Sequence, residues 1–225
     1  MPLTNSSPLV DSTYSLIWLR GADCEGCSIA TLGDASAGGL EQLLGAPAPG
    51  MPQLLLIHPL LSLESGDAFN ARLADCARGK AGRFGLLVES AAVPRPGQEG
   101  WFDCLGEYER QPMSAAAWLD MLAPSADFVT AIGDCAVWGG PHSIGSNPTS
   151  SIGVSMWLGE RYRSRLGLPV INLPGCAAPH GVLGVVRDLV ACAMGNGEPP
   201  PLDEFNRPAA LYGAVWEGAL ALWEY

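Results

Sequence analysis

Four cysteines of this sequence stand where their thiols could act together. Cys24 and Cys27 form a Cys-x-x-Cys motif directly after the apolar stretch 14–19, and Cys135 and Cys176 each follow a later apolar stretch next to a glycine or a tight turn. Four thiolates suit either a tetrahedral zinc ion or a four-iron four-sulfur cluster. Zinc ribbons usually pair two such motifs, so the dispersed second pair favours the cluster. The sequence therefore predicts a metal centre.

The thiols need a scaffold that brings distant segments together, and the hydrophobic pattern predicts one. Strands are expected at 16–19, 53–61, 84–93, 128–132 and 168–173, and helices at 40–44, 67–77, 114–122 and 181–194. This alternation predicts an α/β fold with an open, flavodoxin-like parallel sheet and helices on both faces. Ligands of such sheets bind beyond the carboxyl ends of the strands, so the three strand ends that precede the four cysteines are expected to meet there.

The cysteines also admit other uses. A redox-active dithiol is the nearest alternative for Cys24 and Cys27, because thioredoxin-like folds place the same motif after a strand. That alternative gives no reason for cysteines to follow two other strands. Seven cysteines, an odd number, argue against a disulfide framework. The three outside the motifs are expected to be structural: Cys76 and Cys192 as small apolar side chains of helices, and Cys104 in a loop-like stretch.

Composition and charge exclude several classes of function. The 225 residues are enough for one large domain with a substantial core. Twelve Lys and Arg against 23 Asp and Glu give a net charge of −11, which argues against a nucleic-acid partner. No stretch reaches about 18 uninterrupted apolar residues, so no direct membrane span is predicted. Residues 1–8 lack the features of a secretory signal, which predicts a cytoplasmic location.

A series of short motifs follows in order between about residues 14 and 213. They are Trp18-Leu19, Cys24-Glu25-Gly26-Cys27, His58-Pro59, Val88-Glu89-Ser90, Gly133-Asp134-Cys135-Ala136, Gly139-Gly140, Asn147-Pro148-Thr149, Pro174-Gly175-Cys176, Arg207-Pro208 and Leu211-Tyr212-Gly213. Together they resemble the small, electron-transferring subunit of nickel–iron hydrogenases. The resemblance implies a flavodoxin-like domain that holds the cluster closest to a nickel–iron centre in a separate large subunit. It places the cluster ligands at Cys24, Cys27, Cys135 and Cys176.

The sequence also departs from that family's pattern. Many members carry a glutamate where this chain has Ile29 and a proline where it has Ala177. In many relatives the segment after the Tyr-Gly element supplies a histidine and then cysteines for two further clusters. Here no cysteine follows Cys192. We therefore expect a short form with one four-iron four-sulfur cluster.

The predicted organisation is a flexible tail at 1–13, a flavodoxin-like cluster-binding domain at 14–200 and a C-terminal extension at 201–225 that could form a subunit interface. The predicted function is electron transfer in a cytoplasmic nickel–iron hydrogenase, between the large-subunit site and an external acceptor or donor. No catalytic residue is expected in this chain. Its expected partners are the large subunit and either a further electron-transfer subunit or a soluble redox carrier.

Two alternatives to this function stay open. One is a hydrogen-sensing or regulatory hydrogenase-like module without rapid turnover. The other is a relative of the cluster-bearing quinone-reductase subunits of respiratory complexes. The related domain of those subunits has two adjacent cysteines, a spacing that Cys24-x-x-Cys27 does not match.

Several polar residues near the motifs could contribute. His58 could contact the cluster-bearing edge or cap a strand, and His180 could bond a cluster sulfur or face the partner. Glu25 and Glu89 could relay protons or contact the large subunit, although a solvated glutamate is the commoner case. Asp134, beside a ligand position, would lower the cluster potential if it lies close.

Overall fold

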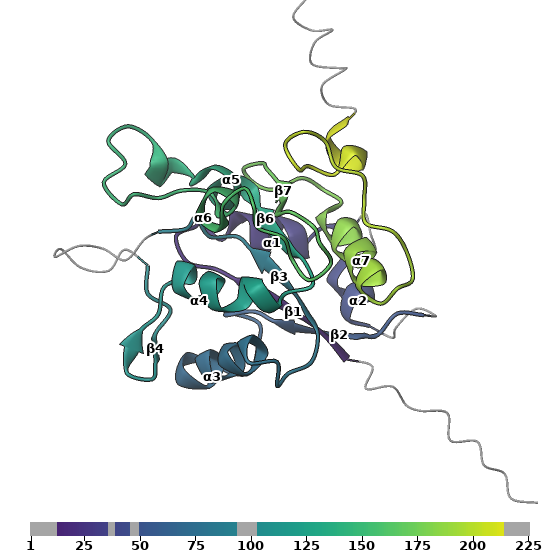
Figure 1. Cartoon of the computed structure of the whole chain (residues 1–225), viewed down its shortest axis with the longest axis horizontal. Coiled ribbons are helices and arrows are strands. Elements are labelled where there is room, and N and C mark those ends of the chain that lie inside the picture. The colour runs from purple at the N-terminus through teal and green to yellow at the C-terminus, as the bar shows by residue number, and fades with distance from the viewer. Residues whose placement is uncertain (1–12, 36–38, 46–49, 94–102, 214–225) are drawn as a thin grey trace, which may run out of the picture.

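The core of the fold is a parallel sheet, seen in a computed structural model that describes residues 13–35, 39–45, 50–93 and 103–213 (Figure 1). Within these residues, five strands pair in parallel in the order β2-β1-β3-β6-β7. Their bounds are β1 Thr13–Leu19, β2 Gln53–Ile57, β3 Phe84–Val88, β6 Val129–Ile132 and β7 Ile171–Leu173. Counted along the chain, this is the order 2-1-3-4-5 of flavodoxin-like sheets. The predicted fold class is confirmed.

Helices cover both faces of the sheet (Figure 1). Their bounds are α1 Gly26–Leu32, α2 Gly39–Leu44, α3 Gly66–Ala77, α4 Ala115–Leu122, α5 Gly133–Trp138, α6 Val154–Leu158 and α7 Val182–Ala193. The helices α3 and α4 pack on one face, and α2 and α7 pack on the other. Two short strands, β4 Glu107–Tyr108 and β5 Gln111–Pro112, form a separate antiparallel pair.

The sequence of β1 shows why the sheet needs both layers. Leu16 and Trp18 point into the core beneath α7, whereas Ile17 and Leu19 point into the core beneath α3 and α4. Successive side chains of a strand point to opposite faces, so an uninterrupted apolar strand requires cover on both sides. Tertiary packing therefore decides the placement of the helices.

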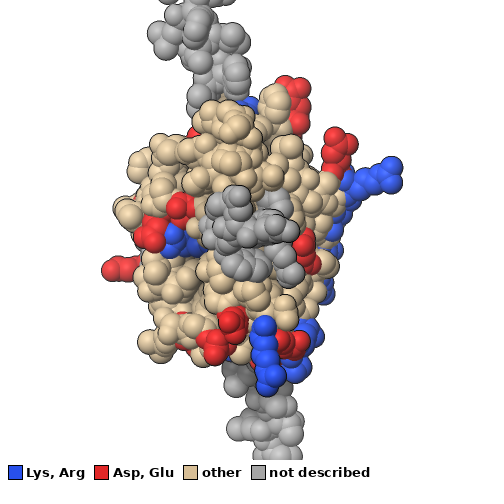
Figure 2. All heavy atoms as spheres, turned by 90° about the vertical axis from the view of Figure 1, so that its left-hand side faces the viewer, with Lys and Arg blue, Asp and Glu red and all other residues tan. Residues whose placement is uncertain are grey.

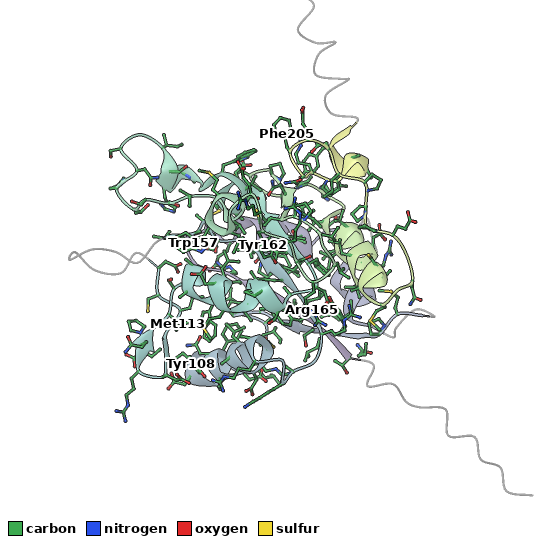
Figure 3. The ribbon with its side chains drawn as sticks, viewed as in Figure 1. Tyr108, Met113, Trp157, Tyr162, Arg165 and Phe205 are labelled. Carbon is green, nitrogen blue, oxygen red and sulfur yellow. The ribbon has the colours of Figure 1, made fainter. Side chains whose placement is uncertain are left out.

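Two aromatic side chains, one in α6 and one shortly after it, bind this part of the chain to α4 and the residue that follows α4. The Tyr162 hydroxyl donates a hydrogen bond to the carbonyl of Ala123 at 2.8 Å, and the Trp157 indole donates one to Asp120 at 2.7 Å; both aromatic rings lie close to α4 in Figure 3. The long segment between β6 and β7 is thereby held against α4 and the residue that follows it.

All five expected strands and all four expected helices are present, with some bounds shifted by a few residues. The pattern did not predict α1, α5, α6 or the β4–β5 pair. These elements have two to seven residues, too few for a helical or alternating period to be recognised. Two of the missed helices carry ligand candidates: Cys27 lies in α1 and Cys135 lies in α5.

The described part of the predicted C-terminal extension packs on the domain. The Arg207 guanidinium lies over the rings of Phe205 and Tyr212, at 5.0 and 5.3 Å from their centres. The Tyr212 hydroxyl donates to the carbonyl of Pro174 at 2.9 Å, so residues 201–213 contact the loop that carries Cys176. Residues 1–12 and 214–225 lie outside the described part, and the proposed division of the chain stays a prediction. Among the described residues, no helix combines the length and apolar character needed to cross a membrane.

Candidate metal centre

The four predicted ligand cysteines line one cavity of about 340 Å³. The cavity lies at the carboxyl edge of the sheet, where the loops after β1, β6 and β7 meet. Three carboxylates, Asp23, Glu89 and Asp134, also line it. The structure thus brings together four thiols that the sequence separates by up to 152 positions, from Cys24 to Cys176.

The loop that carries Cys24 is braced by charged side chains. Arg20 pairs with Asp23 at 2.6 Å and with Glu25 at 3.1 Å. The Asp23 carboxylate accepts the backbone N–H groups of Gly21 and Glu25, both at 2.9 Å. Glu25 itself has a positive φ of 66° and precedes the first residue of α1. This bracing turns the chain sharply between the end of β1 and the start of α1.

Glu89 holds the start of α1. One carboxylate oxygen accepts the backbone N–H groups of Cys27 and Ser28 at 3.1 Å, and the other accepts the Trp18 indole N–H at 3.0 Å and the Ser28 hydroxyl. The first N–H groups of a helix have no partner within the helix, so a carboxylate there stabilises it. Glu89 is only 1% exposed. The interpretation of Glu89 as a solvated glutamate is therefore wrong, whereas the Glu25 side chain is half exposed.

His58 supports the same network from behind. Its Nδ1 accepts the backbone N–H of Leu60, and its Nε2 lies 3.1 Å from the Ser28 hydroxyl, so the neutral ring carries its proton on Nε2. Burial, with a smaller contribution from the Arg20 charge, lowers the pKa of His58 to about 4. His58 does not line the cavity. Its contact with the edge of the sheet that carries the cysteines is indirect, through Ser28.

A clamp joins the other two ligand loops. The Asp134 carboxylate accepts the Gly175 N–H at 2.8 Å, and the Asp134 N–H donates to the Gly175 carbonyl at 3.0 Å. Asp134 precedes Cys135, and Gly175 precedes Cys176. These two hydrogen bonds therefore fix the separation of the loops that carry the third and fourth thiols.

Glycines press the backbone against the sulfurs. A Cβ placed on Gly140 would lie 2.8 Å from Cys135 Sγ, one on Gly26 would lie 3.3 Å from Cys24 Sγ, and one on Gly133 would overlap Cys27 Sγ. The backbone N–H of Ala178 donates to Cys27 Sγ at 3.3 Å. The donor set, the close backbone and the N–H···S contact are the features that hold a cluster. The residues present fit a four-iron four-sulfur cluster.

Burial favours the neutral form of two of these thiols. Burial raises the pKa of Cys27 to about 12 and that of Cys135 to about 11, with smaller contributions from neighbouring groups. A metal ligand must be the thiolate, so binding releases these protons. Across the described ranges, no set of three or more His, Cys, Asp or Glu side chains is arranged to hold a single metal ion.

The three remaining cysteines do not line the cavity. Cys76 is buried in the core beneath α3, and burial raises its pKa to about 11. Cys192 is partly buried in α7. Cys104 is exposed, and its Sγ lies 3.5 Å from the Gly106 carbonyl oxygen. His180 is exposed too, and its Nδ1 lies 3.2 Å from Asp34, which also accepts the N–H of Gly181 at the start of α7.

Three further residues support the site and were not predicted: Arg20, Asp23 and Ser28. An acidic residue just before a helix is a recognised sign of a helix start and could have drawn attention to Asp23. Arg20 and Ser28 carry no local signal. Their roles depend on Glu89, which is more than 60 positions away in the sequence.

Two large exposed apolar side chains line the cavity. They are Trp138 at the end of α5 and Ile144, which is 75% exposed. Ile29 on α1 is also exposed, at 71%. Figure 2, which views the molecule from the left-hand side of Figure 1, shows a mostly uncharged surface with charged side chains toward its margins. Apolar exposure of this kind is typical of an interaction surface.

Comparison with known proteins identifies the family. Residues 24–189 match the model of the family described as NADH ubiquinone oxidoreductase, 20 Kd subunit. The chain belongs to this family. The chain also resembles the Hydrogenase-2 small chain of Escherichia coli (strain K12), with 28% identity over 207 residues, 89% of this chain and 48% of that protein. It is 28% identical to the periplasmic [NiFe] hydrogenase small subunit 1 of Nitratidesulfovibrio vulgaris over 88% of this chain and 56% of that protein.

A solved nickel–iron hydrogenase structure is also similar to this chain. The actinobacterial-type NiFe-hydrogenase from Ralstonia eutropha H16 superposes with a TM-score of 0.81 and 34% identity, over 88% of this chain and 59% of that chain. The resemblance to nickel–iron hydrogenase small subunits is confirmed. The family's description names the respiratory subunit weighed above as an alternative, whereas these three relatives are named as hydrogenases. The chain spans about half the length of the relatives it matches.

Proposed function

We propose that this chain is the electron-transfer small subunit of a nickel–iron hydrogenase and holds one four-iron four-sulfur cluster on Cys24, Cys27, Cys135 and Cys176. The observation that carries the proposal is the cavity, into which three strand ends of one sheet deliver four thiols. Membership of a family whose relatives include hydrogenase small subunits supports it. The other three cysteines do not line the cavity, which supports a single cluster.

A cluster bound here would supply one-electron transfer, while the chemistry of dihydrogen would belong to a nickel–iron centre in the large subunit. The chain's own residues hold and tune the site. Cys27 is 8% exposed, so the backbone and the Ala178 N–H replace water around its sulfur. Cys24 and Cys176 are exposed, which leaves one side of the site open to the surface. Electrons would leave and enter through that side.

The large subunit is the proposed partner at this open side. The exposed Trp138 and Ile144 supply apolar area at the cavity. Cores of interfaces between subunits are depleted in charge and enriched in aromatic residues, which suits this surface. An external acceptor or donor, either a further subunit or a soluble carrier, would complete the electron path.

We also propose a cytoplasmic location. The three cysteines outside the proposed cluster site, Cys76, Cys104 and Cys192, form no disulfide, as expected in a reducing compartment. The related subunit of Nitratidesulfovibrio vulgaris is named periplasmic, so the location needs its own test. Cell fractionation with antibodies against compartment markers decides it, and recovery of the chain with periplasmic markers would refute it.

Iron and acid-labile sulfide, measured in the complex purified without air, test the function. The Cys24→Ser and Cys135→Ser variants should lose iron and sulfide together. Cys104→Ser is the matched control, because its thiol is exposed like that of Cys24 but lies outside the cavity. Zinc in place of iron, or iron that survives both ligand substitutions, contradicts the proposal. Steady reduction of a dye under dihydrogen by the complex would separate turnover from the sensing alternative.

A further inference from the structure

Glu89 is a buried carboxylate beside the proposed cluster site, and hydrogen-bond donors surround it. It stands directly after β3, lines the cavity and receives two backbone N–H groups, an indole N–H and a hydroxyl. The two backbone groups belong to Cys27 and Ser28 in the first turn of α1. A ligand candidate is thus held in place through its own main chain by a side chain from another strand.

Every hydrogen bond of the Glu89 carboxylate comes from a donor. The four groups around its oxygens are two backbone N–H groups, an indole N–H and a hydroxyl, so both oxygens act only as acceptors. The Ser28 hydroxyl can donate to Glu89 because it accepts from His58 Nε2 in turn. Arg20 provides the nearest positive charge, with its Nε 3.7 Å from Glu89, but Arg20 is shared with Asp23 and Glu25. Three carboxylates around one guanidinium leave this side of the cavity negative.

We propose that Glu89 is a positioning residue that fixes Cys27 in the cluster site and that its buried negative charge lowers the reduction potential of the bound cluster. This inference rests on the proposed function, because it takes Cys27 to be a cluster ligand. Reduction adds an electron to a group that already carries negative charge. A fixed negative charge nearby disfavours that step, and it does so more strongly in the low dielectric of a buried site.

Glu89→Gln tests the electrostatic part, because the amide has nearly the same shape and no charge. Its expected effect is an increase of about tenfold in the equilibrium constant for reduction, which is a positive shift of about 59 mV for a one-electron couple. The readout is the midpoint potential from an anaerobic redox titration of the complex, followed by electron paramagnetic resonance of the reduced cluster. Iron and sulfide contents are measured on the same samples.

Asp127→Asn is the matched control. Asp127 is equally buried and is bonded to the Tyr14 hydroxyl at 3.0 Å and to Arg83 at 2.9 Å. Asp127 lies two residues before β6, at the amino edge of the sheet and therefore away from the cavity. Its carboxylate faces Arg165, which Figure 3 labels on that side of the molecule. This variant removes a buried charge without approaching the cysteines. Its potential should equal that of the wild type.

Ser28→Ala provides a test of opposite sign. It removes one donor from Glu89 but keeps the charge, so the carboxylate is less neutralised and the potential should fall. This variant also decides the electrostatic part if Glu89→Gln fails to fold or folds without iron. Loss of iron from folded Glu89→Gln, with iron retained in Asp127→Asn, supports the positioning part.

An unchanged midpoint potential in Glu89→Gln with full iron content overturns the inference. If Glu89→Gln does not fold or lacks iron, an unchanged midpoint potential in Ser28→Ala overturns it instead. An equal shift in Asp127→Asn overturns it too, because the effect would then not be local. These outcomes leave the proposed function intact. Wild-type complex without iron and sulfide would overturn the proposed function and this inference with it.

Discussion

Substitution of Gly140 tests whether the backbone forms the cluster cradle. Gly140 has φ 66° and ψ −164°, a region that glycine alone adopts readily, and a Cβ there would lie 2.8 Å from Cys135 Sγ. Ordinary van der Waals contact begins at 3.4 Å. Gly140→Ala therefore requires the sulfur and the added methyl group to separate by about 0.6 Å, whereas metal–ligand distances tolerate about 0.2 Å. We expect this variant to lose iron and sulfide.

Gly159 offers a control with the same backbone requirement. Its φ of 82° and ψ of 157° lie in the same glycine-only region, but a Cβ there meets no atom within 4 Å. Both alanine variants should lose about 1–3 kcal/mol of unfolding free energy through backbone strain. Only Gly140→Ala should also lose iron, measured per chain after purification without air. Equal iron in the two variants would refute the assignment of Gly140 to the cradle.

Three further predictions concern titration and the loop clamp. The pKa of His58 is lowered from 6.5 to about 4, so the unfolded chain binds a proton before the folded chain does as pH falls. The free energy of unfolding should therefore decrease between pH 6.5 and pH 4. Urea titrations should show a smaller decrease in His58→Gln than in the wild type. Burial raises the pKa of Asp103 from 3.8 to about 6, so the free energy of unfolding should decrease as pH rises through that range. Asp103→Asn should therefore be more stable than the wild type at pH 7 and equally stable below pH 3.8. Equal stability of the two proteins at both pH values would contradict this prediction. Asp134→Ala removes the acceptor of the Gly175 N–H and should lower the iron content. Asp134→Asn keeps an amide oxygen at that position and should retain more iron. Equal iron contents in the two variants would show that the clamp is dispensable.

The sequence was sufficient for the sheet and for the convergence of the thiols. The strands are short, mostly apolar runs such as residues 14–19, and their order along the chain constrains which ends share an edge. The four cysteines could be selected because each follows such a run. Neither step needed knowledge of contacts between distant residues, which is why both predictions agree with the structure.

The supports of the site could not be predicted in the same way. Glu89 looks like a surface residue when judged by its type alone, because glutamate is seldom fully buried unless it is paired. Its burial depends on donors from Trp18, Cys27 and Ser28, and these become neighbours only when β1, β3 and α1 pack together. Short helices such as α5 also depend on contacts between residues that are distant in the sequence. Gly133–Trp138 is too short for a helical period and is fixed by the bonds between Asp134 and Gly175.

The supports also imply that the site is organised largely before a metal arrives. The Glu89 network and the Asp134–Gly175 clamp join protein groups to one another and include no cysteine sulfur. The core on both faces of the sheet consists mainly of apolar side chains outside the ligand set. In small zinc domains, by contrast, metal binding supplies the folding free energy itself. Here the sheet and its loops fix the ligand positions, so more of the binding free energy can go into holding the cluster, and less is spent on ordering the chain.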